Sequence, residues 1–150
     1  MSDKSFNGKR GVDLLGLRGL QMVEGQGLYA AGVQFPPVQY GGQTLLPGQA
    51  NNSYVFPAVG MAIYATQAKR VTDEMFTEAA RGISDQVTPD QLKQGLLFPP
   101  QSNILEIEIK TAARVAKVVF DSNLARVERP ADLEAFIRSQ VYKPEYRSLV

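Results

Sequence analysis

The chain has 150 residues, with 16 basic and 15 acidic side chains, so we expect one compact domain or a piece of a larger one, with a formal charge of +1. A near-neutral charge gives no electrostatic attraction to nucleic acid or to an anionic membrane, and we expect neither as a partner. Cysteine and histidine are both absent, which excludes disulfides, thiolate nucleophiles, histidine-based triads and cysteine or histidine zinc sites.

The sequence offers no segment for secretion or membrane insertion. Its first residues, MSDKSFNGKRG, lack the apolar stretch of a signal peptide. The longest apolar run, residues 58–65, is far shorter than the ~20 residues that span a bilayer. We therefore expect a cytoplasmic protein.

The first third of the chain is predicted to contain no regular helix, with extended segments over residues 28–48. Glycine recurs through residues 1–27, which argues against a regular helix there. Residues 28–48 contain short β-favouring pieces separated by proline and glycine pairs. Of these pairs, Gly41-Gly42 predicts a hairpin turn.

One glycine motif has the spacing of a dinucleotide-binding loop. Residues 25–30, GQGLYA, fit the fingerprint G-x-G-x-x-G/A, in which glycines let a pyrophosphate approach the start of a helix. No clear strand precedes this motif, Pro36-Pro37 prevents a following helix, and no carboxylate lies about 20 residues further on to hold a ribose. We interpret its glycines as turn residues.

From Asn51 onward the periodicity becomes helical. A helix over residues 72–87 is predicted by an apolar stripe and by two acidic residues, Asp73 and Glu74, in its first turn. The string Thr88-Pro89-Asp90-Gln91 is a capping box that begins a short helix, and Gly95 ends it.

Two further helices are predicted to begin at Asn103 and at Pro130, and the first of these is the longest in the chain. The fold class is therefore mainly α with a small β element. The residues expected to face inward are Phe76, Ala79, Ala80, Ile83 and Val87 in the helix over 72–87, Leu105, Ile109, Ala112, Ala113, Ala116, Val119 and Phe120 in the longest helix, and Leu133, Phe136, Ile137 and Val141 in the last.

Two pairs of carboxylates could suggest acid-base or metal chemistry. The pairs are Asp73/Glu74 and Glu106/Glu108, and each lies near a predicted helix N-terminus, where acidic residues stabilise the helix dipole. Adjacent or alternate positions of a helix also point to different faces. We therefore expect neither pair to converge on one ion.

Two amides, Asn51 and Asn52, precede the apolar helix that carries Pro57. Such amides can accept hydrogen bonds from the first N–H groups of the helix, or they can donate to a carboxylate or carboxamide ligand at its N-terminus. From the residues alone, the helix-cap interpretation is favoured.

Four stretches carry a family resemblance: FPPVQYGGQTLLPGQANNSYVFPAVGMAIYA, KRVTDEMFTEAA, DQVTPDQLKQGLLFPPQSNI and SQVYKPEYRSLV. The most specific strings are PGQ-x-NN-x-Y-x-FP at 47–57 and G-x-L-x-PP at 95–100. In their order and spacing these stretches resemble the C-terminal part of malic enzymes, the NAD(P)-dependent oxidative decarboxylases of malate. The resemblance covers residues 28–150 and leaves residues 1–27 as an unmatched glycine-rich stretch.

The resemblance implies that residues 28–150 are the end of a Rossmann-type NAD-binding domain followed by a helical C-terminal region. It implies that Asn52 binds a malate carboxylate and that Asn51 lies near both the substrate and the nicotinamide. A primary amide suits this task because it donates to a carboxylate without adding a charge that must be desolvated. The cofactors implied are NAD or NADP, with Mg²⁺ or Mn²⁺ in the complete enzyme.

The family's catalytic tyrosine and lysine, its substrate-binding arginine and its three acidic metal ligands have no counterpart in this chain. We therefore expect no catalytic and no metal-binding residue here, and no activity of the chain alone. Residues 1–24 also lack the family's SNPT-like motif, so we expect Met1 to begin unrelated sequence fused to a family remnant, as in a truncated, frameshifted or misassembled reading frame. The alternatives are a non-catalytic helical interaction module that associates with a full-length malic enzyme, a homo-oligomer, or a poorly folding, nonfunctional product.

Overall fold

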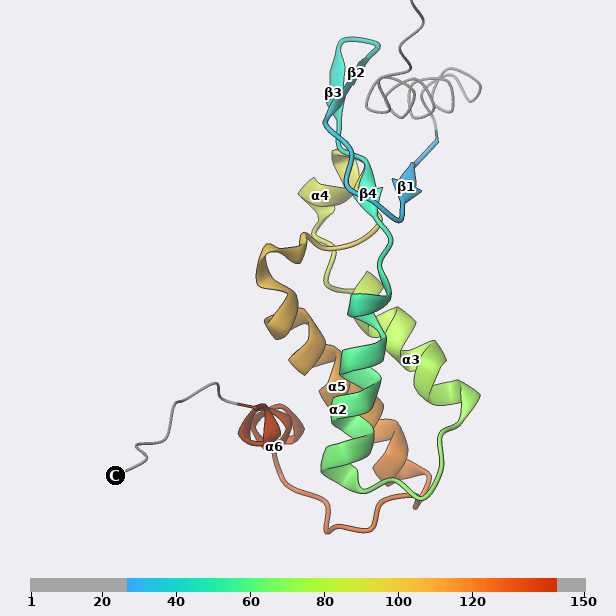
Figure 1. Cartoon of the computed structure of the whole chain (residues 1–150), viewed down its shortest axis with the longest axis vertical. Helices are drawn as coiled ribbons and strands as arrows, with labels where there is room; N and C mark the ends of the chain where they lie inside the picture. Colours follow the sequence, from blue (N-terminus) through green and yellow to red (C-terminus); the bar gives the residue numbers. More distant parts are fainter. Residues whose placement is uncertain (1–26, 143–150) are drawn as a thin grey trace, which may run out of the picture. The chain divides into compact units, whose positions relative to one another are not determined.

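The computed structural model describes residues 27–142, and about half of these residues lie in helices (Figure 1). A helical content of about one half with a few short strands is thus confirmed for the described residues, in part agreement with the predicted fold class. Among the described residues, no helix combines the length and the apolar character that a membrane crossing requires. The elements are β1 (Ala30–Ala31), β2 (Val38–Tyr40), β3 (Gln43–Leu45), β4 (Gly48–Gln49), η1 (Asn52–Tyr54), α2 (Phe56–Thr66), α3 (Asp73–Ser84), α4 (Pro89–Lys93), η2 (Gln101–Asn103), α5 (Ile104–Asp121) and α6 (Leu133–Gln140).

The chain divides into two compact units. We call the first the strand unit, because its described part holds the four strands together with α4, and the second the helical unit. Most of the glycine-rich stretch and the first two residues of the GQGLYA motif lie outside the described residues. The strand unit comprises Met1–Asn52 and Ser84–Gln101, and the helical unit comprises Ser53–Ile83 and Ser102–Val150.

The predicted hairpin is confirmed in the strand unit. Strands β2 and β3 pair antiparallel, with Tyr40 opposite Gln43. The two residues between them, Gly41 and Gly42, have φ angles of 58° and 79°. A two-residue turn with positive φ at both positions matches the twist of a hairpin, and glycine adopts it without steric cost.

The predicted capping box is confirmed at the start of α4. The backbone N–H of Gln91 donates to the Thr88 hydroxyl oxygen at 3.3 Å, and the N–H of Thr88 donates to the Gln91 side-chain oxygen at 2.9 Å. Beyond the last turn, the N–H of Leu46 donates to the carbonyl oxygen of Gln94 at 2.7 Å, which ties α4 to the strands. Gly95 follows with a φ of 89° and ends the helix as predicted.

The strand unit nevertheless buries little apolar surface. Apart from Pro99, no apolar side chain in the described part of this unit is buried. Its pairs of two- and three-residue strands are short, and isolated two-stranded sheets are only marginally stable in water. The core of the chain is therefore in the helical unit.

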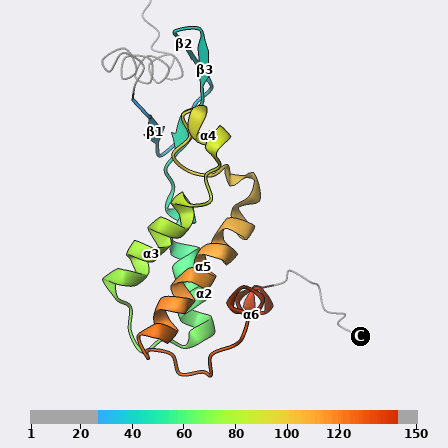
Figure 2. The ribbon, with the colours of Figure 1, turned by 180° about the vertical axis from the view of Figure 1, so that it is seen from behind.

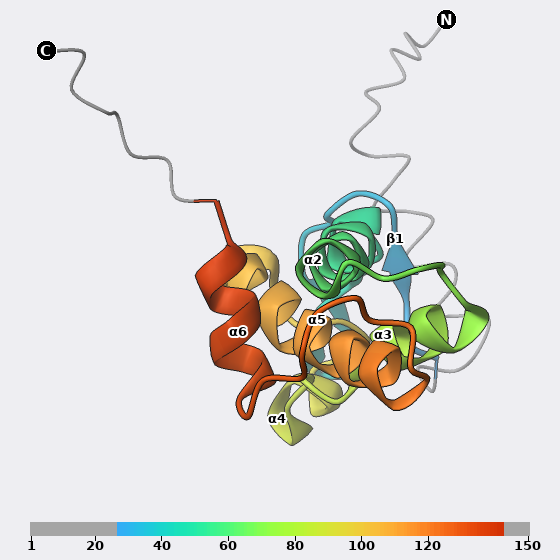
Figure 3. The same cartoon turned by 90° about the horizontal axis from the view of Figure 1, so that it is seen from below.

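Helices α2 and α5 pack against each other, and α3 and α6 lie on opposite sides of this pair (Figures 2 and 3). Small side chains on α2 and α5 allow the two helices to approach closely. The fully buried residues of the core are Ala58, Ala62, Met75, Ala79, Ala112, Val115, Ala116, Val119 and Ile137, with Ile109 almost as deeply buried.

The apolar stripe predicted for α3 is partly wrong. Ala79 and Ile83 are buried as predicted, but Phe76 is 41% exposed and its place in the core is taken by Met75. Ala80 is exposed as well, and α3 ends at Ser84, so Val87 lies outside the helix. The reason lies at Gly82, which is buried against α5: a Cβ at this position would lie 3.2 Å from Arg114 Cδ. Because α3 contacts α5 at Gly82, the buried face of α3 is rotated by about one residue relative to the predicted apolar stripe.

Three details of the later helices also differ from prediction. Leu105 is 47% exposed and lies in the first turn of α5. Asn103 does occupy the N-cap position of α5, but its side chain makes no capping hydrogen bond. Helix α6 begins at Leu133 rather than Pro130, because the side chain of Asp132 accepts a hydrogen bond from the N–H of Ala135 at 3.0 Å and caps the helix there.

An ion-pair network joins α5 to α6. The Arg138 guanidinium binds both carboxylate oxygens of Glu106, at 2.6 and 2.8 Å, and also contacts Glu134 at 3.1 Å. The hydrogen bonds from Arg138 hold the pKa of Glu106 below its ordinary value of 4.5. Glu106 is thus occupied by a structural contact.

Glu108 has the opposite electrostatic behaviour. It is only 9% exposed, and desolvation raises its pKa above the ordinary value of 4.5. The folded state therefore favours the protonated form, so stability is lost as the pH rises through the unfolded value toward the folded one. Glu106 and Glu108 thus have separate surroundings, as expected.

We expect Glu108→Gln to raise the melting temperature at pH 7, because the amide has no charge to desolvate. For a chain of this length, the melting temperature should rise by about 2–4 °C for each kcal/mol gained in the free energy of unfolding. At pH 3, where glutamate is protonated in both states, the two proteins should melt together. Circular dichroism melts from pH 3 to 8 measure this, with the exposed Glu128→Gln as control; a lower midpoint at pH 7 would contradict the burial cost.

Candidate functional site

The candidate site is the pair of asparagines that follows strand β4. Both Asn51 and Asn52 are exposed, and Asn52 is the first residue of the 3-10 turn η1. The pair thus begins two residues after the last residue of β4, Gln49.

Strand β4 is fixed in the strand unit by a parallel partner, β1. Ala30 lies opposite Gly48 and Ala31 opposite Gln49. The N–H of Gly48 donates to the carbonyl oxygen of Tyr29 at 2.9 Å, and the N–H of Ala50 donates to that of Ala31 at 2.8 Å. The backbone is therefore held by β1 up to the residue directly before Asn51.

Gly48 lies at the start of β4 and is buried among close neighbours. A Cβ on Gly48 would lie 3.4 Å from the Cβ of Ala30 and 3.5 Å from the backbone nitrogen of Leu97. These are ordinary van der Waals distances, so a single methyl group would fit at this position. The contacts show that β4 packs closely against β1 and against the backbone at Leu97.

The carboxyl end of a parallel strand is the place where α/β sheets bind their ligands. Asn51 and Asn52 occupy this end of β4 and are accessible to solvent. Each amide offers two N–H donors and one oxygen acceptor, so the pair can bind a carboxylate or a carboxamide. The sequence predicted the amides but missed the parallel β1–β4 pairing that places them.

The N-cap position of α2 is occupied by a residue other than the two asparagines. Val55 occupies the N-cap position with φ −101° and ψ −54°, and its side chain makes no capping hydrogen bond. Pro57 lies in the first turn, where its missing N–H leaves one donor fewer to satisfy. Neither asparagine is thus the N-cap residue of this helix.

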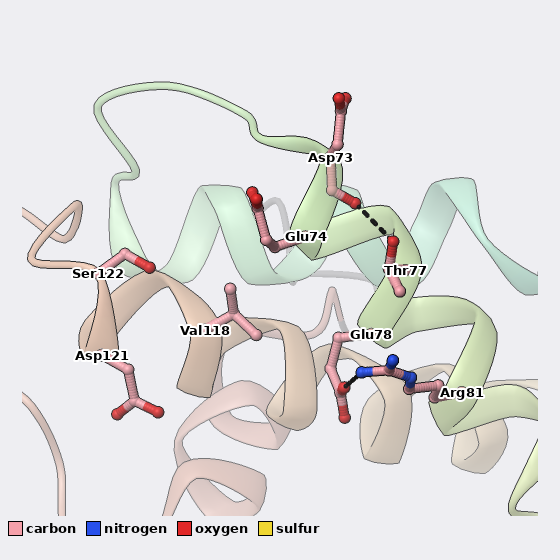
Figure 4. Close-up of a pocket in the computed structure, with 8 residues that line it drawn as sticks. All are labelled: Asp73, Glu74, Thr77, Glu78, Arg81, Val118, Asp121 and Ser122. Atoms are coloured by element: carbon pink, nitrogen blue, oxygen red, sulfur yellow. Dashed lines mark hydrogen bonds and ion pairs between the residues drawn. The ribbon is translucent and has the colours of Figure 1, made fainter.

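The helical unit contains a cavity of about 450 Å³ between α3 and the end of α5 (Figure 4). Its acidic residues include the predicted pair Asp73 and Glu74. The side chains that line it belong to Asp73, Glu74, Thr77, Glu78, Arg81, Val118, Asp121 and Ser122.

Two of the acidic side chains that line this cavity form ion pairs. Glu78 binds Arg114 at 2.6 Å and Arg81 at 3.7 Å, and Asp121 binds Arg129 at 2.7 Å. The hydrogen bonds from its basic neighbours hold the pKa of Asp121 below the ordinary value of 3.8. Ion pairs of this kind stabilise the helical unit and give the cavity no free ligand set.

The acidic start of α3 is likewise structural. A backbone hydrogen bond lowers the pKa of Glu74, and the hydroxyl of Thr72 contributes a second hydrogen bond. Deeper in the first turn, the Thr77 hydroxyl donates to the carbonyl oxygen of Asp73 at 3.1 Å (Figure 4). Across residues 27–142, no cluster of three or more acidic residues could hold a metal ion.

The comparisons with known proteins identify the family. The family model described as "Malic enzyme, NAD binding domain" matches residues 18–120. The chain is 43% identical over 129 residues to the NADP-dependent malic enzyme of Columba livia, 42% over 126 residues to that of Vitis vinifera, and 37% over 135 residues to that of Sus scrofa.

The alignments cover 85%, 83% and 89% of this chain, but 23%, 21% and 24% of the respective relatives. The chain thus spans about a fifth to a quarter of the length of the curated relatives it matches. The family match begins within residues 1–27, and the domain boundary at residue 28 stays a prediction. With a match over more than half of its length and relatives about 40% identical across most of it, the chain belongs to the malic enzyme family.

Proposed function

We propose that this chain forms part of an NAD(P)-dependent malic enzyme, in which malate is oxidatively decarboxylated to pyruvate and CO₂ while NAD(P) is reduced. The observation that carries this proposal is the exposed pair Asn51 and Asn52 at the carboxyl end of a parallel strand, in a chain of this family. The names of the relatives and of the matching family support the reaction and the cofactor.

The strand unit is proposed to be the end of a Rossmann-type NAD-binding domain, followed by the helical region. The parallel pairing of β1 with β4 supports this assignment, because parallel strands are typical of such domains. The GQGLYA motif is not proposed as its phosphate loop, because the chain enters strand β1 at Ala30 rather than a helix.

In this role, the amide of Asn52 donates a hydrogen bond to a malate carboxylate and Asn51 contacts substrate and nicotinamide. A neutral amide holds the carboxylate without the desolvation cost of a second buried charge. The two residues bind and orient the substrate, and they move no proton, because an amide does not titrate in this pH range.

The two implied cofactors fit the described residues differently. Exposed amides at the carboxyl end of β4 fit the carboxamide of a nicotinamide, and NAD(P) supplies the hydride acceptor when it is bound. The described residues do not fit Mg²⁺ or Mn²⁺, since no three of their carboxylates lie close enough together to hold a metal ion. The metal therefore has no place in the role proposed for residues 27–142.

We expect the isolated chain to lack malate-decarboxylating activity, because catalysis needs the acid, base, hydride acceptor and metal in one site. A chimera in which residues 28–150 replace the matching segment of the Columba livia enzyme should be active. NAD(P)H formation is measured with malate, NAD or NADP, and Mg²⁺ or Mn²⁺. Turnover by the isolated chain, or a folded chimera without turnover, would contradict the proposal.

The second candidate is a helical module that associates with a complete malic enzyme without contributing to catalysis. The exposed aromatic side chains of α2, Phe56 and Tyr64, favour some association. An active chimera would decide against this candidate, since a non-catalytic module could not replace the segment. Homo-oligomerisation and the cytoplasmic location stay predictions.

A further inference from the structure

Helix α5 carries an acidic side chain that is buried without a polar partner. Glu108 is nine-tenths buried, and it makes neither a hydrogen bond nor an ion pair with any residue that the structure describes. Two residues earlier in the same helix, Glu106 is by contrast bound to Arg138. Burying a carboxylate without a partner costs free energy, so a carboxyl group at this position calls for an explanation.

Glu108 continues the fully buried stripe of α5. Ala112, Val115 and Val119 follow it at helical spacing and have no exposed surface, so the four side chains lie along one line of the helix. These three residues belong to the core that α5 shares with α2, the helix that lies beside it (Figures 2 and 3). The carboxyl group therefore lies on the core side of α5.

The other two helices of the unit contact α5 on different sides. Glu106 marks the side of α6 and lies about 160° around the helix from Glu108, at 3.6 residues per turn. Thr111 marks the side of α3, where a Cβ on Gly82 would lie 3.4 Å from Thr111 Cγ2, and it lies about 60° from Glu108. Glu108 thus lies on the α2 side of α5, next to α3.

The elements around Glu108 do not compensate its charge. Helix α2 has no charged residue, and its one titratable side chain, Tyr64, is 73% exposed. Tyr54 in η1 is buried and makes an interaction of its own. The charged groups of α3 and α6 that lie along α5 are held in the ion pairs Arg114–Glu78, Arg81–Glu78, Arg138–Glu106 and Arg138–Glu134. Desolvation is accordingly the cause that raises the pKa of Glu108.

The far ends of α2 and α5 are tied together. The N–H of Arg126, just beyond α5, donates to the carbonyl oxygen of Thr66 in the last turn of α2 at 3.0 Å. The N–H of Lys69 donates to the carbonyl oxygen of Leu124 at 2.9 Å. The two helices therefore end at the same place, and both begin at the opposite end of their interface.

Glu108 lies at this starting end. At a rise of about 1.5 Å per residue, it is about 20 Å from the end of α5, and Phe56 is about 15 Å from the end of α2. The carboxyl group is therefore level with the beginning of α2. This beginning is weakly held, because the N-cap residue Val55 provides no side-chain cap.

We propose that ionisation of Glu108 opens the start of α2, which gives the helical unit a pH-dependent opening at the α2–α5 interface. The neutral carboxyl group leaves the interface closed. The carboxylate needs water, and it gains water when the first turn of α2 moves away while the tied ends of the helices stay in place. Since η1 leads directly into α2, the opening lies next to the turn that carries Asn52.

The direction of the pH dependence follows from proton binding. The closed form binds the proton of Glu108 more tightly than the open form, because the carboxyl group is desolvated only in the closed form. Opening therefore becomes more favourable as the pH rises above the ordinary glutamate pKa of 4.5, until Glu108 is ionised in the closed form as well. This opening does not depend on the reaction proposed for the chain.

Hydrogen exchange of the 150-residue chain tests the proposal, measured by NMR from pH 4 to pH 7 and corrected for the intrinsic exchange rate. The amides of Val59, Gly60 and Met61 donate the first hydrogen bonds of α2 and should lose protection as the pH rises. The loss should be about tenfold for each pH unit by which the pKa of Glu108 in the closed form exceeds that of an exposed glutamate. The amide of Lys69, at the tied end, should keep its protection.

Two variants assign the effect to this carboxyl group. Glu108→Gln keeps the size of the side chain and removes its ionisation, so protection at the start of α2 should no longer change with pH. The matched control, Glu128→Gln, removes an exposed carboxyl group and should behave like the parent. In the parent, a ¹³C NMR titration of the Glu108 carboxyl should have the same midpoint as the loss of protection, which tests the proposal even if Glu108→Gln does not fold.

Three results would overturn the proposal. The first is protection at the start of α2 that does not change with pH in the parent, or that changes equally in Glu108→Gln. The second is an equal loss of protection throughout α2, α5 and α6, since this would show unfolding of the whole unit. The third is a Glu108 titration midpoint at the ordinary glutamate value, which would show that the closed form does not desolvate the carboxyl group.

Discussion

Asn52→Ala in the active chimera is expected to lower kcat/KM for malate by about ten- to a hundredfold and to leave the melting temperature unchanged. A hydrogen bond from a neutral donor to a charged carboxylate contributes about 1.5–3 kcal/mol, which corresponds to that loss. Thermal stability should not change, because Asn52 is exposed and Val55 occupies the N-cap position of α2. Steady-state kinetics and thermal melts of the same preparation measure both quantities.

The matched control for this variant is Asn103→Ala. Asn103 is also exposed and also precedes a helix, and its side chain makes no capping hydrogen bond. It should therefore change neither kinetics nor stability. Asn52→Asp should impair malate use at least as strongly as alanine, because it places a carboxylate against a carboxylate. A lowered midpoint with unchanged kcat/KM in Asn52→Ala would reject the substrate role.

Gly82→Leu should destabilise the helical unit by about 1–3 kcal/mol, the usual cost of overfilling a packed interface. A Cβ at Gly82 would lie 3.2 Å from Arg114 Cδ, 3.4 Å from Thr111 Cγ2 and 3.5 Å from Thr111 Cα. The end of the arginine side chain can move, but the backbone of α5 at Thr111 cannot move without displacing the helix. The expected fall in melting temperature is about 2–4 °C for each kcal/mol.

The control uses the same substitution at Gly60, where a Cβ meets nothing within 4 Å. Comparison of the two leucine variants separates the effect of the interface from the effect of losing a glycine within a helix. If Gly82→Leu and Gly60→Leu melt at the same temperature, then α3 and α5 are not in tight contact at Gly82.

Local signals in the sequence were sufficient where the structure depends on neighbouring residues. The capping box at Thr88 and the hairpin turn at Gly41 and Gly42 are each determined within about four residues, and both are confirmed. Helix periodicity also predicted the presence of α3 and α5, although α3 ends at Ser84 rather than at Val87. Its prediction of the buried face failed at Phe76, because the rotation of α3 depends on where its glycine meets another helix.

The site required information that no local pattern contains. Short amides before a helix act either as caps or as ligand donors, so the residues alone could not decide between these roles for Asn51 and Asn52. The pairing of Ala30 with Gly48 joins two-residue strands that are far apart in the sequence, and such strands have no periodicity to detect. Only the resemblance to malic enzymes pointed to a ligand at this position.

The shortage of buried apolar side chains in the strand unit has a consequence for how ligands bind. Native-state hydrogen exchange should show the amides of β1 and β4 opening at a far lower free energy than those of α5. Because the chain from β4 to Asn52 belongs to this less protected unit, part of the intrinsic affinity for any ligand at the amides is spent on ordering their backbone. If the proposed ligand binds at these amides, its binding and the local folding of β4 form one coupled equilibrium, and a contact that immobilises β4 also raises the affinity for that ligand.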